Sequence, residues 1–259
     1  MKRELAFAVA LTVAASYAAA HDFWLVPMGE EIQGITGSAF PTSTNAVNPT
    51  RLLEAVVVSR AGRKPLEVVG TRDSMLILKA DPEVSGTFWA AIALHPRRID
   101  LSASDFNEYL LHDGLPQIHA ERARRGELDR PAVERYQKFA KALITRSGGR
   151  GGSVALEPVG HRLEVVPLED PSTLTPGDTL GVEVRFEGKP LAGLTVNAGW
   201  AGQPDSTHAF TAVANPAGRV RVPISTAGVW YVRTIHMRAV AEPPFQWESF
   251  WATLVFVMR

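Results

Sequence analysis

Seven histidines and no cysteines define the metal and catalytic chemistry open to this chain of 259 residues. Without thiols there are no disulfides, thiolate zinc sites, iron–sulfur clusters or cysteine nucleophiles. Imidazole and carboxylate groups would therefore have to bind any metal, and neutral nitrogen ligands favour nickel, cobalt, copper or zinc. The sequence has no HExxH, HxH or GxSxG motif and no phosphate-binding glycine loop. We therefore expect a protein that is not an enzyme.

The first twenty residues give one histidine a special position. Lys2 and Arg3 precede an apolar run that ends in Ala18-Ala19-Ala20, which is typical of a cleaved secretory signal peptide. Removal of residues 1–20 would make His21 the N-terminal residue, so that its free amine and ring Nδ1 could chelate a metal ion. No other segment is long and apolar enough to cross a bilayer. We therefore expect an exported protein that does not span the membrane after cleavage.

A site built on His21 needs further ligands from the fold. Strand alternation places His236 on the same half-buried face as Trp230 and Val232, which makes it the second candidate metal ligand. His208, which precedes a strand expected around Phe210, is the third. For each of the two, the competing interpretation is an ordinary histidine that is hydrogen-bonded in or near the core.

The elements that must position these residues are mostly short strands. Runs at 52–59, 75–79 and 86–94 are apolar, β-branched or aromatic and are bounded by turn residues. From about 160 onward the apolar residues alternate with a period of two, and turns recur every 8–12 residues, as in an antiparallel immunoglobulin-like sandwich. We therefore expect a mostly β protein with two immunoglobulin-like antiparallel β-sandwich domains, at residues 21–167 and 168–259.

Residues 102–145 differ from the rest and predict a helical insertion in the first domain. Phe106, Tyr109 and Leu110 have helical spacing, and a second segment runs from about 116 to 125. A third helix is expected after Pro131, with Tyr136, Phe139 and Leu143 along one face and Glu134, Lys138 and Lys141 on a solvated face.

Charge gives no indication of a charged partner. The chain has 27 basic and 27 acidic residues, so its formal net charge is zero. A nucleic-acid-binding protein would ordinarily present an excess of basic groups. We therefore expect no nucleic-acid partner.

Several motifs spread along the chain resemble those of one bacterial family. The start His21-Asp22-Phe23-Trp24-Leu25 is the most distinctive, and the other matching segments are 37–41, 134–136, 141–143, 163–167, 188–193, 230–237 and 247–254. This family of secreted proteins is catalogued as a domain of unknown function, and its members are often described as periplasmic components of nickel/cobalt uptake systems. The resemblance implies a periplasmic location, immunoglobulin-like domains, a metal-related role and no established catalysis.

Three functions follow as hypotheses. The first is a periplasmic accessory protein that captures nickel or cobalt through His21, His236 and His208 and delivers it to a membrane transporter subunit. The second is a copper monooxygenase, in which an N-terminal histidine and a second histidine form a copper-binding brace. The third is an envelope binding module that uses no metal.

Overall fold

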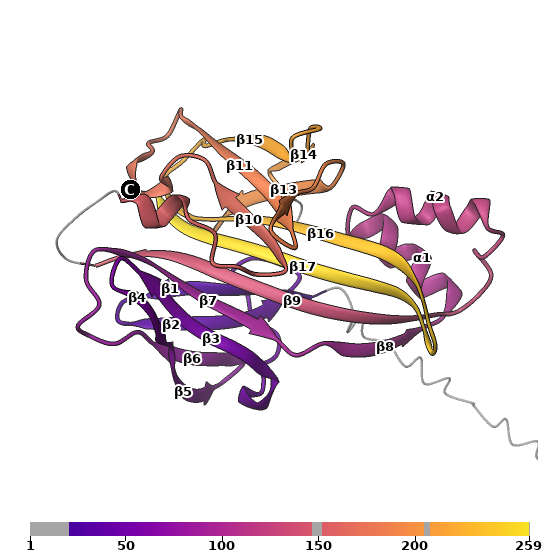
Figure 1. Ribbon diagram of the computed structural model, residues 1–259, viewed down its shortest axis with the longest axis horizontal. Coiled ribbons are helices and arrows are strands. Elements are labelled where there is room, and N and C mark those ends of the chain that lie inside the picture. Colours follow the sequence, from indigo (N-terminus) through magenta and orange to yellow (C-terminus); the bar gives the residue numbers. More distant parts are fainter. Residues whose placement is uncertain (1–20, 147–151, 205–207, 259) are drawn as a thin grey trace, which may run out of the picture.

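The computed structural model describes residues 21–146, 152–204 and 208–258. The expected signal peptide at 1–20 lies outside the described residues. The described residues form three β-sheets, and two short helices lie beside the far ends of the longest strands (Figure 1). The mostly β class and the antiparallel layers predicted from the sequence are confirmed. No helix among the described residues is long and apolar enough to cross a membrane.

The central sheet has nine strands and is the middle layer. In spatial order its strands are β14 (Phe210–Val213), β13 (Thr195–Trp200), β16 (Gly228–Glu242), β17 (Phe245–Met258), β9 (Ala132–Thr145), β7 (Thr87–Leu94), β3 (Leu52–Ser59) and β4 (Gly62–Pro65), with β8 (Arg97–Leu101) also paired to β9. β17 and β9 are parallel neighbours. Strands from both sides of the boundary expected at 167/168 therefore hydrogen-bond within one sheet.

A smaller sheet covers each face of the central one. The N-terminal sheet contains β1 (Asp22–Met28), β2 (Glu31–Gly37), β6 (Met75–Lys79) and β5 (Glu67–Arg72). The C-terminal sheet contains β10 (Leu163–Pro167), β11 (Thr179–Phe186), β12 (Lys189–Pro190) and β15 (Arg219–Pro223). Short 3₁₀ turns occur at Pro49–Arg51, Ser153–Leu156 and Pro171–Thr173.

Alternation along β16 shows which core each face of the central sheet meets. Trp230 and Val232 enter the core shared with the C-terminal sheet, whereas Tyr231 enters the core shared with the N-terminal sheet. Further along the strand, Ile235 and Met237 pack against the helices in a third core. The N-terminal sheet and the helices thus cover successive parts of the same face, and Arg233 lies between them.

The helical insertion is shorter than the sequence predicts. Helices α1 (Ala103–His112) and α2 (Pro116–Arg124) are present, and Ser102 caps α1 by accepting a hydrogen bond from the Asp105 amide. The third expected helix is wrong, because Ala132–Thr145 is strand β9. β9 lies between β7 and β17 and is covered on both faces, so its apolar residues do not alternate as in a half-exposed strand.

Candidate functional site

His21 lies directly before β1 and is half-buried. Its carbonyl oxygen accepts a hydrogen bond from Lys138 Nζ on β9, which fixes the backbone here. The ring Nδ1 lies 3.3 Å from Thr44 Oγ1. Because the Thr44 hydroxyl donates its proton to the Thr36 carbonyl, Thr44 Oγ1 is the acceptor in its contact with the ring. The imidazole therefore carries its proton on Nδ1, and Nε2 holds the free lone pair.

Burial and the Lys138 ammonium lower the pKa of His21 below 6.5. Its imidazole is therefore neutral at pH 7, which is the form that binds metal ions. The Asp113 carboxylate acts in the opposite direction on the same pKa, so its charge is felt at the His21 ring. A neutral imidazole thus lies at the start of β1 within the field of a buried carboxylate.

Beside His21, Arg233 joins three parts of the chain that are far apart in sequence. Its Nε lies 2.9 Å from Asp22 Oδ2 at the start of β1, and its Nη2 lies 3.0 Å from Asp113 Oδ1 at the end of α1. Its Nη1 lies 3.0 Å from His208 Nε2. We call Asp22, Asp113, His208 and Arg233 the Arg233 cluster. Arg233, Asp22 and Asp113 are each at most 5% exposed, so the charges of the cluster are desolvated.

The acidic members of the cluster have perturbed pKa values. Burial raises the pKa of Asp22 to about 6, although the Arg233 cation acts to lower it. Burial also raises the pKa of Asp113, again against Arg233. On neighbouring β9, burial raises the pKa of Glu134 to about 7 and lowers that of Lys138 to about 8. Such a concentration of shifted groups is typical of functional sites and of buried ion networks.

Both ring nitrogens of His208 have partners in the cluster. Arg233 Nη1 can only donate, so His208 Nε2 must be the acceptor and the ring proton must be on Nδ1. That proton is donated to Tyr231 Oη, at 2.8 Å. Burial and the Arg233 charge lower the pKa of His208 to about 4, which keeps the ring neutral. The structure therefore places His208 near the N-terminal strand but leaves neither ring nitrogen free.

His236 lies on the other face of the central sheet. Its ring packs against Phe186 and Phe250, with ring centroids 4.6 and 6.1 Å apart respectively. The strand face predicted for His236 is confirmed, but His21 meets the opposite face. The three histidines predicted as ligands therefore do not form one site here. Within residues 21–146, 152–204 and 208–258, no group of three or more histidines and carboxylates is arranged to hold a metal ion.

Two residues of the cluster, Asp113 and Arg233, were not predicted from the sequence. Asp113 follows α1 and resembles an ordinary helix-ending residue, and Arg233 resembles one of many basic residues in strands. One signal was present for Arg233, because it lies between Tyr231 and Ile235 on the same face of a strand, and that face is otherwise apolar. A lone charge on such a face implies buried counter-charges, although the sequence does not say which residues supply them.

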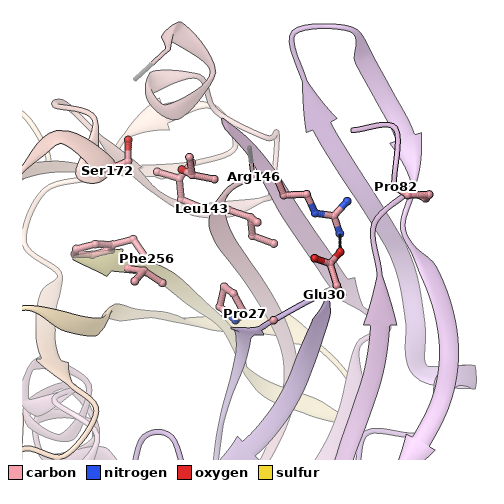
Figure 2. Close-up of a pocket in the computed structure, with 11 residues that line it drawn as sticks. Pro27, Glu30, Pro82, Leu143, Arg146, Ser172 and Phe256 are labelled. Carbon is pink, nitrogen blue, oxygen red and sulfur yellow. Dashed lines mark ion pairs between the residues drawn. The ribbon is translucent and has the colours of Figure 1, made fainter. Parts of the chain in front are cut away.

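His21 lines neither of two hollows in the described part of the structure. One, of about 430 Å³, opens where Glu30 and Arg146 face each other, 3.7 Å apart, near Leu143 and Phe256 (Figure 2). Another, of about 370 Å³, is lined by Trp24, Phe40, Tyr231 and His208 and so borders the Arg233 cluster. Of the three candidate ligands, only His208 lines either hollow.

Comparison with known proteins assigns the chain to a family. A family model described as "Domain of unknown function (DUF4198)" matches residues 18–238. The chain belongs to this family. No curated protein matches this chain. Among solved structures, the "D0-D1 domain of Intimin" is 12% identical and matches with a TM-score of 0.21, covering 92% of this chain and 98% of that one. DUF4198 membership carries no assigned activity.

Proposed function

We propose that this protein is an exported, periplasmic metal-binding accessory protein. Its cargo is a divalent late first-row ion, nickel or cobalt first, delivered to a membrane transporter subunit. The observation that carries the proposal is the state of His21: a half-buried, neutral imidazole held at the start of β1. Removal of residues 1–20 would add a free amine beside this ring, and the two together form a chelating pair.

Chelation through the amine and Nδ1 requires the ring to release Thr44. That contact is 3.3 Å long and exposed to solvent, so its net contribution is at most about 1 kcal/mol. Metal coordination by protein nitrogen ligands is worth several times as much, on the order of 10 kcal/mol in complete structural sites. The Thr44 contact therefore orients the imidazole ring of His21 without preventing chelation.

Other groups near His21 position it and are not ligands. The Asp22 carboxylate is held by Arg233 Nε, which lies 3.1 Å from Oδ1 and 2.9 Å from Oδ2. Lys138 holds the His21 carbonyl, and β1 pairs with β2 from Asp22 onward. These contacts fix the backbone, so that the amine and the ring are presented in a restricted geometry, which lowers the entropy lost on binding.

The test is isothermal titration of nickel and of cobalt into two forms of the protein. One form begins at His21, and the other retains Ala20 and therefore carries an amide in place of the His21 amine. We expect the extended form to bind at least tenfold more weakly. Equal affinities would exclude the N-terminal chelate.

The variant His236→Phe is the matched control for loss of an imidazole. Its ring would stay between Phe186 and Phe250, on the far face of the central sheet. We expect this variant to bind nickel as the unchanged protein does. A tenfold loss of affinity in His236→Phe would restore His236 as a ligand and contradict a site on the N-terminal face alone.

A further inference from the structure

The parallel ladder between β9 and β17 stops before either strand ends. Its last pair is Ala142 with Val255, whereas β9 continues to Thr145 and β17 to Met258. No strand pairing joins these two ends to each other in the described part of the chain. Three residues on each strand, about 10 Å of extended backbone, therefore lack a ladder partner between them. We call the region between these two strand ends the β9–β17 opening.

Backbone groups of both strand ends point into the β9–β17 opening. The Arg146 amide donates to the Gly86 carbonyl beside β7, so the N–H and C=O of Thr145 point away from β7, toward β17. Val257 lies opposite Val229, whose carbonyl accepts a hydrogen bond from the residue after β13. The backbone groups of Val257 therefore point away from β16, toward β9. Both strands thus offer hydrogen-bond donors and acceptors at strand spacing to a segment that enters between them.

The hollow beside Arg146 lies at the β9–β17 opening. Residues 143–146 line it from the end of β9, and Phe256 and Val257 line it from the end of β17 (Figure 2). Pro27 and Ser172 also line the hollow. Its volume of about 430 Å³ falls within the usual range of ligand pockets, about 300–1,000 Å³. A short extended segment can therefore lie beside both strand ends.

Arg146 is the cationic group that lines this hollow. Its Nη1 donates to the Asp81 carbonyl at 2.9 Å, which holds the guanidinium in place. Its one ion pair among the described residues is with Glu30, at 3.7 Å, and the Glu30 side chain is 87% exposed. Exposed ion pairs contribute little, so a carboxylate from a ligand can replace Glu30. Arg146 thus favours an anionic group at the outer end of the β9–β17 opening.

We infer that the β9–β17 opening is a docking site for an extended segment of a partner polypeptide that carries an acidic side chain. The backbone of this segment pairs with Thr145 and Val257 as an added strand, and its carboxylate binds Arg146. Only an extended backbone supplies donors and acceptors at the spacing that both strand ends require. His21 does not line this hollow, so the inference goes beyond the proposed metal site and does not depend on it.

The experiment uses residues 21–259 and a hexapeptide of alternating valine and threonine that ends in glutamate and is blocked at both termini. A matched peptide ends in glutamine. Nuclear magnetic resonance follows hydrogen exchange at the amides of Thr145 and Val257, with Val255 as the reference inside the ladder. Fluorescence anisotropy of the labelled peptides gives their affinities.

Two variants test the carboxylate contact. Arg146→Gln removes the charge, and Arg146→Lys restores it. The matched control is Arg72→Gln, because Arg72 is about half exposed, pairs with Glu31 and does not line the hollow. Circular dichroism checks that each variant folds.

We expect the amides of Thr145 and Val257 to exchange faster than that of Val255 in the free protein and to slow when the glutamate peptide binds. The glutamine peptide should bind at least fivefold more weakly. Arg146→Gln should remove this difference between the peptides, whereas Arg146→Lys and Arg72→Gln should keep it.

Four results would overturn the inference. The two amides are as protected as that of Val255 before any peptide is added, or neither peptide binds at millimolar concentration. The glutamate peptide binds without slowing exchange at the two amides, or Arg146→Gln leaves its advantage unchanged. Sedimentation of the free protein as a dimer in which both amides are protected is a case of the first result, and it would assign the opening to a second copy of this chain.

Discussion

Replacement of Arg233 by methionine tests whether the Arg233 cluster holds the N-terminal strand to the rest of the molecule. Methionine fills the space of the arginine stem but removes the guanidinium, which contacts Asp22, Asp113 and His208. Two buried carboxylates would then lose their only ion-pair partner in the cluster. Removing one partner of a buried ion pair ordinarily destabilises a protein by about 3–5 kcal/mol. We expect a loss in that range at pH 7.5.

The loss should depend on pH with a definite sign. The pKa of Asp22 is already raised from 3.8 to about 6 with Arg233 present, which corresponds to about 3 kcal/mol against the ionised folded form. Without the cation, the pKa values of Asp22 and Asp113 rise further. An acid whose folded pKa exceeds its unfolded pKa favours folding at low pH, and this stability is lost as the pH rises through the folded pKa. Arg233→Met should therefore be less damaging at pH 5 than at pH 7.5, by at least about 1 kcal/mol.

Urea unfolding followed by circular dichroism at both pH values measures these differences. The matched control is Arg98→Met, because Arg98 pairs with Asp100 on β8 and both side chains are about half exposed. Exposed ion pairs contribute about 0–1 kcal/mol, so the control should lose little at either pH. A loss below about 1 kcal/mol for Arg233→Met at pH 7.5, or the same loss at pH 5 and pH 7.5, would refute the reasoning.

Two more buried charges give contrasting expectations. Glu134 accepts hydrogen bonds from Tyr109 and Ser249, and burial raises its pKa to about 7. Glu134→Gln keeps the acceptor, so its free energy of unfolding should equal that of the unchanged protein below about pH 4, where Glu134 is protonated in both states, and exceed it by about 3 kcal/mol at pH 8.5, as measured by urea unfolding. Lys141 pairs with Glu164 inside the core between the central and C-terminal sheets. The free energy of unfolding of Lys141→Met should fall by about 3–5 kcal/mol in the same assay. Adding Glu164→Gln should recover part of this loss, because the amide oxygen still accepts the Val159 N–H. If the double variant recovers nothing, the penalty does not come from an unpaired buried charge.

The strands with one clear buried face could be predicted from the sequence. Val182 and Val184 on β11, and Trp230 and Val232 on β16, alternate with residues of the other face, and all four enter the core between the two sheets. Alternation alone determines which residues share a face, because successive side chains in a strand point to opposite sides. The strand boundaries at 52–59 and 75–79 are also confirmed.

Strand β9 shows where this reasoning fails. Tyr136, Phe139 and Leu143 have helical spacing by coincidence, because both faces of β9 are covered and apolar residues occur at odd and even positions alike. Lys138 and Lys141 looked like parts of a solvated helix face, yet both are buried. Each is satisfied by a group distant in sequence, the His21 carbonyl and Glu164 respectively. A buried lysine cannot be distinguished from an exposed one until its partner is known.

The partners of the charged residues in the candidate site could not be predicted from the sequence either, because they come from different layers of the fold. The N-terminal sheet covers one part of the central sheet, the helices cover the next, and the two apolar cores meet around Arg233. Elements begin or end at such a junction: β1 starts there with Asp22, and α1 finishes there at His112. Polar groups can therefore reach the junction without interrupting either core, and an arginine there needs acceptors from separate elements. The sequence identifies His21 through the pattern before it, but it does not show that Asp22 and Asp113, 91 residues apart, bind the same guanidinium of Arg233.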